Sequence, residues 1–328
     1  MRYIQVGVGY RFRLVPKVLA DLPGWECCGV IASRSRVRTR RMDHNSLELE
    51  GTVGRYLKER KPDLVVCLTP TRLTARVLRV CAEVGTPVLG HPPLVDELAG
   101  ELTRIHIGMY TLFTPSNLAR LRVVERGDIG DVTQVQISGT PIFSAVALMR
   151  KFLGTGLDDG RASAHRFQRI TLGSLDFGED RMGIFQPGSQ SSRGTPARLL
   201  VKGSAGEISG DQVVQRGGLI RISYLRRSQV LTSGTGALPL TQQLPYLCEI
   251  SYGGTTLWMN PFPQMEWSEK ELGIAQYLSH LEVHLRGEGP SPYSLIEAAH
   301  DARLIQGLVQ AIREAGDSHG YPGTELHL

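Results

Sequence analysis

The stretch that most constrains the fold of this 328-residue chain lies at its start. An apolar run from Tyr3 to Val6 leads into Gly7 and Gly9, and apolar residues at helical spacing follow. This order indicates a strand, a tight turn and a helix. Such a turn suits a pyrophosphate bound at the helix N-terminus. Gly7 permits the turn, and Gly9 lets a ligand approach the backbone. Because Phe12 replaces the third glycine of the dinucleotide fingerprint, an ordinary strand–helix turn stays open as the alternative.

The end of the second predicted strand bears on which dinucleotide would bind. The strand runs from Glu26 to Ala32, where NAD-specific sites usually present an acidic residue to the ribose. Here Ser33 and Arg34 follow instead, and a guanidinium group suits a 2′-phosphate because it donates forked, charge-assisted hydrogen bonds. We therefore expect NADP, with NAD as the alternative. The further arginines at positions 36, 38, 40 and 41 are more typical of a solvated basic loop.

A third buried strand, from Leu64 to Leu68, ends in Thr69 and Pro70. Strands that are apolar on both faces belong to parallel sheets covered by helices. Ligands of open sheets bind at the carboxyl ends of the strands, which is where Thr69 and Pro70 fall. Short strands follow at residues 87–89 and 105–109, with helical patterns between. This alternation predicts a doubly wound Rossmann sheet for the first half of the chain.

The pattern changes after residue 130. Residues 132–137 alternate in part between apolar and polar side chains, as a strand with one solvated face does. We therefore expect an NAD(P)-binding domain over residues 1–112 and an α+β domain over 113–328, built on a large open, mostly antiparallel sheet. The last helix would pack back on the first domain. Further strands are predicted at residues 198–202, 213–215, 219–224, 247–252 and 255–258.

Composition argues against several classes of protein. The chain has no uncharged apolar run long enough to cross a bilayer and begins on a core strand, so neither a membrane span nor a signal peptide is expected. Its five cysteines lie in apolar settings without zinc-site spacing, which favours packing thiols in the cytoplasm and no metal. Lysine and arginine number 37 against 32 aspartate and glutamate, and the arginines lack interleaved aromatic residues. Nucleic acid is therefore not expected as a partner.

Several motifs recur in order along nearly the whole chain. Besides the G-x-G turn they are residues 62–66 before Thr69-Pro70, residues 87–89 before Pro93-Leu94, residues 127–132, residues 202–207, and the late helix with Ser294, Glu297, Ala298 and Arg303. In this order they resemble the glucose-fructose oxidoreductase / inositol dehydrogenase / rhizopine catabolism (Gfo/Idh/MocA) family. The resemblance implies NAD(P) in the first domain, a sugar, polyol or related carbonyl compound over the second, and hydride transfer between them.

The chain departs from the family pattern where the resemblance places its proton-transfer groups. Members usually carry a lysine in a Glu-Lys-Pro turn after the fourth strand. Aligned on that turn, His91 stands at the glutamate and Pro92, which cannot titrate, at the lysine. A family histidine is expected near Ser144 or at His165, but the first position is serine and the second lacks its flanking aspartates. His91 is therefore the first candidate acid or base, because an unperturbed imidazole titrates near neutrality, and His165 is the second.

Two functions stay open. In the first, the protein is an NADP-dependent oxidoreductase for a small polar carbonyl, hydroxyl or imine compound, with a proton from His91, water, Tyr10 or Tyr110. In the second, the fold has lost catalysis and senses a cofactor or metabolite for a partner protein. An open sheet face exposes apolar surface in a monomer, so a homodimer or tetramer is expected. The residues expected to bind the cofactor are Gly7, Gly9, Tyr10, Arg11, Ser33, Arg34, Thr69, Pro70 and His91.

Overall fold

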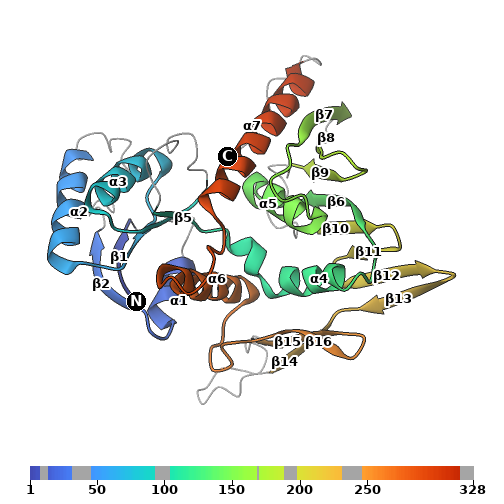
Figure 1. The fold of residues 1–328 in the computed structure, drawn as a ribbon, viewed down its shortest axis with the longest axis horizontal. Helices are drawn as coiled ribbons and strands as arrows, with labels where there is room; N and C mark the ends of the chain where they lie inside the picture. The colour runs from blue at the N-terminus through green and yellow to red at the C-terminus, as the bar shows by residue number, and fades with distance from the viewer. Residues whose placement is uncertain are drawn as a thin grey trace, which may run out of the picture. The chain divides into compact units, whose positions relative to one another are not determined.

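The computed structural model describes residues 1–7, 14–31, 46–92, 104–167, 170–187, 198–230 and 246–317 (Figure 1). The chain divides into two compact units. The first comprises Met1–Tyr110 and Ile274–Ala299, and the second comprises Thr111–Gly273 and His300–Leu328. Unit 1 thus takes in most of helix α6 (Glu269–Leu285), whereas most of the last helix, α7 (Leu295–Asp317), lies in unit 2.

Unit 1 is built on a five-stranded sheet in the order β2-β1-β3-β4-β5, in which all neighbours are parallel. Strands that follow one another through a helix give this topology, and the predicted doubly wound sheet is confirmed. Chain order reverses between β1 and β3, which makes their carboxyl ends the switch point. The elements are β1 (Arg2–Val6), α1 (Leu14–Asp21), β2 (Glu26–Ile31), α2 (Ser46–Arg60), β3 (Leu64–Cys67), α3 (Thr71–Val84), β4 (Val88–Gly90) and β5 (Ile105–Ile107).

The inner strands of this sheet form because their side chains are apolar on both faces, whereas the edge strand β2 is largely exposed. All four residues of β3 and all three of β4 are buried, as the continuous apolar runs predict. Helix α3 ends at Gly85, whose left-handed backbone (φ 76°) lets its N–H bond to the carbonyl of Ala82. A glycine suits that position because other residues are strained there. Burial of both sheet faces therefore leaves the strand ends as the part open to ligands.

Unit 2 contains an eight-stranded sheet in the order β13-β12-β11-β10-β6-β9-β8-β7. Only the pair β6–β9 is parallel among the described neighbours, so the predicted mostly antiparallel sheet is also confirmed. The strands are β6 (Val132–Ser138), β7 (Arg161–Phe167), β8 (Ile170–Asp176), β9 (Met182–Gln186), β10 (Arg198–Gly203), β11 (Gly206–Ser209), β12 (Gln212–Gly217) and β13 (Leu219–Tyr224).

Helices α5 (Ile142–Leu153) and α7 cover one face of this sheet. A Cβ on Gly183 of β9 would lie 2.7 Å from the sulfur of Met149 on α5. Gly307 of α7 in turn lies against Ala162 of β7, since a Cβ there would be 3.3 Å from that of Ala162. Because successive strand residues point to opposite faces, odd-numbered residues of β7 face away from these helices. The opposite face is therefore the open one among the described residues.

The remaining elements of unit 2 form a smaller layer (Figure 1). Helix α4 (Pro115–Glu125) lies against a three-stranded antiparallel sheet of β14 (Arg226–Val230), β15 (Tyr246–Tyr252) and β16 (Thr255–Met259). A short 3₁₀ helix, η3 (Tyr110–Phe113), precedes α4. Ser294 and Glu297, whose spacing in the sequence is that of a capping box, form one at the start of α7, with the Ser294 hydroxyl donating to the Glu297 carboxylate at 2.8 Å. Ser268 and Glu271 cap α6 in the same way, at 2.6 Å.

The sequence patterns missed five strands, β7, β8, β9, β11 and β14. Most of these are short or rich in Gly, Ser and Arg, so their apolar alternation is weak and neighbouring strands must stabilise them. The sequence also predicts a helix beginning near Leu94 and loops at residues 186–196 and 232–243, and most of these stretches lie outside the described residues. Among the helices that the structure describes, none is long and apolar enough to cross a bilayer.

Candidate functional site

The candidate site is the carboxyl edge of the unit 1 sheet, at the switch point between β1 and β3. Gly7 follows β1 with φ 89°, a left-handed conformation that side chains resist. A Cβ at this position would lie 2.7 Å from the carbonyl oxygen of Leu68 and 3.1 Å from the methyl group of Thr69. The Gly7 N–H donates to the carbonyl of Ile31 at 2.7 Å, so the turn is held between β2 and β3. Glycine is therefore required here by space and by backbone conformation together.

Hydroxyl groups line the end of β3 beside this turn. The Thr69 and Thr74 hydroxyl oxygens lie 2.9 Å apart, and the Thr69 hydroxyl lies 3.2 Å from the Cys67 sulfur. The Thr74 hydroxyl also donates to the Thr69 carbonyl at 3.1 Å. Pro70 is exposed and begins α3, so the strand ends in a fixed polar turn. The predicted residues Gly7 and Thr69 are thus neighbours at one point of the sheet edge.

Aromatic side chains lie at the ends of the next two strands. His91 follows β4 and Tyr110 follows β5, and their ring centroids are 5.5 Å apart. Tyr277 of α6 packs against the ring of Tyr110, and the two ring centroids are 5.1 Å apart. The Tyr277 hydroxyl donates to the Ile107 carbonyl at 2.8 Å. The Tyr110 hydroxyl is buried and has no hydrogen-bond partner among the described residues.

Burial keeps both groups neutral at physiological pH. Loss of solvation by burial lowers the pKa of His91 to about 3. Burial, with a smaller contribution from Tyr277, raises the pKa of Tyr110 well above its usual value of about 10. A neutral imidazole and a neutral phenol can form hydrogen bonds, but neither exchanges a proton with water readily near pH 7. The edge of β4 and β5 is therefore apolar and uncharged at these two side chains.

The other predicted site residues divide into two groups. Pro92 follows His91 directly and is half-buried. His165 lies on β7 in unit 2, where it is exposed on the sheet face opposite α5 and α7. The two candidate histidines therefore belong to different units. Five predicted cofactor-binding residues lie outside the described residues: Gly9, Tyr10, Arg11, Ser33 and Arg34.

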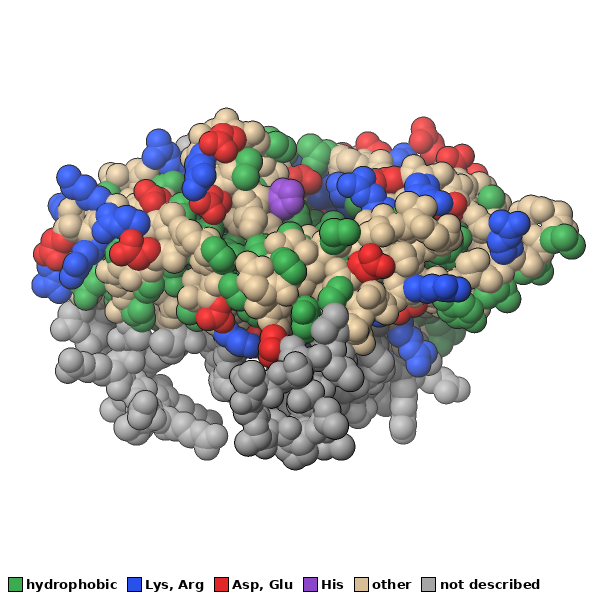
Figure 2. Space-filling model, turned by 90° about the horizontal axis from the view of Figure 1, so that it is seen from below, with side chains coloured by type: hydrophobic (Ala, Val, Ile, Leu, Met, Phe, Trp, Pro, Cys, Tyr) green, Lys and Arg blue, Asp and Glu red, His purple; other side chains and the backbone are tan. Residues whose placement is uncertain are grey.

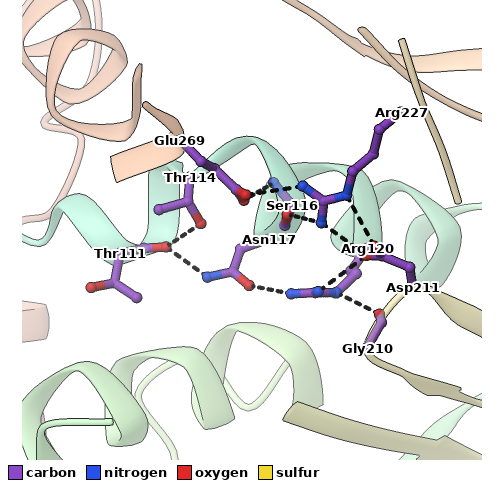
Figure 3. A network of polar contacts seen from close by, with 9 residues as sticks. All are labelled: Thr111, Thr114, Ser116, Asn117, Arg120, Gly210, Asp211, Arg227 and Glu269. Carbon is purple, nitrogen blue, oxygen red and sulfur yellow. Dashed lines mark hydrogen bonds and ion pairs between the residues drawn. The ribbon is translucent and has the colours of Figure 1, made fainter. Parts of the chain in front are cut away.

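Unit 2 contains a different kind of polar cluster, drawn in Figure 3, which joins α4, β14, the start of α6 and the turn before β12. The Arg227 guanidinium donates to both oxygens of Asp211 (2.9 and 3.0 Å), to Glu269 (3.0 Å) and to the Ser116 hydroxyl (2.7 Å). Arg120 donates to Asp211 at 3.4 Å and, from the same guanidinium, to the side-chain oxygen of Asn117 at 3.1 Å. Opposite charges face one another throughout, which indicates a structural role.

The end of this cluster reaches the position where the family resemblance places a histidine. The Asn117 amide donates to the Thr111 carbonyl at 2.8 Å (Figure 3). The Thr111 hydroxyl donates in turn to the Ser144 hydroxyl on α5, at 3.2 Å. Ser144 is half-buried and is engaged with a neutral partner. A serine in this setting can position a ligand, but it has no proton that titrates near neutrality.

Comparison with known proteins finds the same fold in solved structures. No protein-family model matches the chain, and no curated protein matches its sequence. Solved structures do match. An oxidoreductase from Agrobacterium radiobacter in complex with NAD+, L-tartaric acid and magnesium is 12% identical, with a TM-score of 0.63 over 97% of both chains. At such low identity the similarity establishes the fold.

Two further structures share the architecture. Aldose-aldose oxidoreductase from Caulobacter crescentus, complexed with glycerol, is 16% identical with a TM-score of 0.62, covering 96% of this chain and 98% of that one. GenD2 from gentamicin A biosynthesis, in complex with NAD, is also 16% identical, with a TM-score of 0.63 over 97% of this chain and 95% of that one. The chain thus matches the full length of proteins that combine a Rossmann unit with a large open sheet.

Two residues of the site were missed or underweighted by the sequence patterns. Tyr110 was considered only as one of several proton sources, since a lone tyrosine after a short strand carries no distinctive spacing. The sequence pattern places Gln5 within an apolar strand and assigns it no role. Its polarity in the middle of a buried run was the available signal, because a polar residue there needs a partner.

Proposed function

We propose that this protein is an oxidoreductase of the Gfo/Idh/MocA type that binds a nicotinamide dinucleotide at the carboxyl edge of the unit 1 sheet. It would act on a small polar carbonyl, hydroxyl or imine compound. The observation that carries the proposal is the turn at Gly7, which lies at the switch point and leaves no room for a side chain. Two structural neighbours, the Agrobacterium radiobacter oxidoreductase and GenD2, were solved in complex with NAD, which supports the same ligand class.

The described residues fit such a cofactor. A Cβ at Gly7 would meet the carbonyl of Leu68, so the glycine keeps the turn tight against the end of β3, as the first glycine of a dinucleotide fingerprint does. Thr69 and Pro70 would flank the cofactor at the end of β3, and His91 and Tyr110 would flank its nicotinamide end. The proposed preference for NADP rests on Ser33 and Arg34 in the sequence, because an arginine there suits the 2′-phosphate.

The bound dinucleotide would supply or accept the hydride. The described side chains proposed to lie beside its nicotinamide end, His91 and Tyr110, are neutral. With Pro92 where the family resemblance places lysine, no amine is available at that position. His91 and Tyr110 therefore act by hydrogen bonding and by excluding water rather than as a charged acid and base. A neutral hydrogen-bonding group can stabilise the charge that develops on the oxygen or nitrogen of the substrate during hydride transfer. This stabilisation is strongest where water is excluded.

Dinucleotide titration tests the cofactor, and a substrate panel tests the chemistry. We expect NADPH to bind more tightly than NADH in a fluorescence titration. We then expect turnover of at least one member of a panel of sugars, polyols and cyclic imines. His91→Ala should lower kcat, whereas His165→Ala, an exposed residue in the other unit, serves as the matched control. Equal affinity for both cofactors would contradict the role of Ser33 and Arg34.

One observation favours a second function, a non-catalytic sensor of the same ligand. The two titratable side chains at the edge of β4 and β5 are both held neutral by burial, and one proton-transfer group is commonly worth about 10²- to 10⁴-fold in rate. Tight dinucleotide binding without turnover of any panel member would select the sensor. Gain of turnover in Pro92→Lys would show that only the amine was missing.

We also propose that the protein self-associates through the open face of the eight-stranded sheet. Strand pairing places most of the exposed apolar side chains of β7, β9 and β13 on this face, away from α5 and α7. Figure 2 shows apolar side chains at the end of the molecule formed by the β12–β13 hairpin. The exposed residues on this face are Phe167, Met182, Ile220, Ile222 and Tyr224.

Light scattering after size-exclusion chromatography tests this self-association. Ile222→Glu would place a charge on the open face and should shift the protein towards the monomer. Leu219→Glu is the matched control, because Leu219 is exposed on the same strand but points to the opposite face. A wild-type protein that is monomeric at high concentration would contradict the proposal.

A further inference from the structure

Gln5 is an exception within the core of unit 1. It lies on β1, an interior strand paired with β2 and β3, and only 8% of it is exposed. Its neighbours Tyr3, Ile4 and Val6 are buried as well. A buried amide stabilises a fold less than an apolar side chain of similar size unless its hydrogen bonds are made. An amide at this position therefore has to be explained by what it binds.

The Gln5 amide binds the carbonyl of the Gly7 turn. Its Nε2 donates to the Gly7 carbonyl oxygen at 2.8 Å. The N–H of the same glycine donates to the carbonyl of Ile31. Its Cα packs against Leu68, whose carbonyl oxygen lies 2.7 Å from the position that a Cβ would take. The backbone of Gly7 is thus held at its N–H, at its Cα and at its carbonyl, and only the last of these depends on a side chain.

This bond is local, unlike the bonds of a residue that holds a fold together. Arg227 links elements far apart in unit 2, whereas the partner of Gln5 in the described structure lies two residues along the same chain. Among the described residues, Gln5 therefore connects no two elements, and it adds little to the packing of the sheet that Leu or Met would not add. What it does determine is the orientation of a carbonyl at the switch point.

We propose that Gln5 is a positioning residue of the dinucleotide site, which holds the Gly7 carbonyl and keeps the turn in its left-handed conformation when a pyrophosphate lies against it. The inference rests on the proposed function, because it assigns Gln5 to that same site. Gln5 would contact the turn and not the ligand. Without the amide, the Gly7 carbonyl would be free to rotate towards the phosphate oxygens, which would repel it.

The test compares ligand affinity with stability in the same variants. Gln5→Met keeps the length of the side chain and removes the donor, and Gln5→Leu repeats the change with another apolar shape. We expect the Kd for NADPH to rise by roughly three- to tenfold, as loss of one hydrogen bond predicts, while the melting temperature stays the same or rises. Tyr3→Phe, on the same face of the same strand, is the matched control and should leave the Kd unchanged.

Each outcome has one meaning. Weaker binding without loss of stability supports the inference, since a residue needed only for folding would lower the melting temperature. Wild-type affinity in both Gln5 variants would overturn it while leaving the proposed function intact. Failure of both variants to fold would also overturn it, because the amide would then be structural. Absence of dinucleotide binding in the wild type would overturn the proposed function and this inference together.

Discussion

In unit 2, two arginines and two carboxylates face one another across α4, β14, α6 and the turn before β12, and each guanidinium finds oxygen partners. Among the described residues at the carboxyl edge of the unit 1 sheet, the polar groups are neutral instead. His91 is held uncharged by burial, and the Tyr110 hydroxyl has no partner in the described structure. Paired charges stabilise a fold, whereas an unpaired buried hydroxyl destabilises it. The contrast therefore separates a structural cluster from a binding edge.

The largest effect is expected from breaking a buried ion pair of unit 2. Arg150 of α5 donates to Asp301 of α7, and both side chains are almost fully buried. Asp301→Ala would leave a buried guanidinium without its carboxylate, so the free energy of unfolding should fall by about 3–5 kcal/mol. Urea denaturation measures this. A loss below about 1 kcal/mol would mean that Asp301 is not needed to compensate the charge.

Acidification should destabilise the protein through the neutral edge of unit 1. The pKa of His91 is about 3 when folded, against about 6.5 when unfolded, so the unfolded chain binds the proton first. Stability is therefore complete above about pH 6.5 and is lost as the pH falls towards 3. Between pH 7 and pH 5 His91 accounts for a loss of about 2 kcal/mol, which His91→Leu should abolish.

His106 should add to the same acid loss. Burial and the neighbouring His284 lower its pKa to about 4, with the two rings 5.4 Å apart. Wild type and His91→Leu should therefore both lose stability on acidification, the variant less steeply. His165→Ala removes an exposed histidine and should follow the wild-type curve. Parallel curves for wild type and His91→Leu would show that His91 is accessible to protons in the folded state.

The smallest effect on stability is expected for Tyr110→Phe. It separates binding from folding, because the variant should lose turnover without losing stability. Tyr110→Phe removes a buried hydroxyl that has no partner among the described residues, so the free energy of unfolding should stay constant or rise by about 1 kcal/mol. Turnover should fall, because the hydroxyl is proposed to face the reacting group. A variant that loses stability would show that the hydroxyl is bonded within the fold.

Much of this architecture could be predicted from the sequence, and the reasons for the rest are physical. The continuous apolar run Leu64–Cys67 indicates a strand buried on both faces, which is typical of a parallel sheet. The spacing of Ser294 and Glu297 indicates the capping box of α7. Strands β7 to β9 could not be predicted, because partners across the sheet stabilise them more than their own residues do. Gly7 and Thr69 were foreseen at the sheet edge. The neutrality of His91 was not, since burial is set by residues distant in sequence such as Tyr110 and Tyr277.

Hydrogen–deuterium exchange of the wild-type protein with and without NADPH tests the central claim most directly. The account predicts saturable protection in peptides that cover Gly7 and the turn from Thr69 to Thr74, with little change over the Arg227 cluster. Absence of protection at any NADPH concentration, or protection confined to the Arg227 cluster, would contradict a dinucleotide site at the edge of the unit 1 sheet.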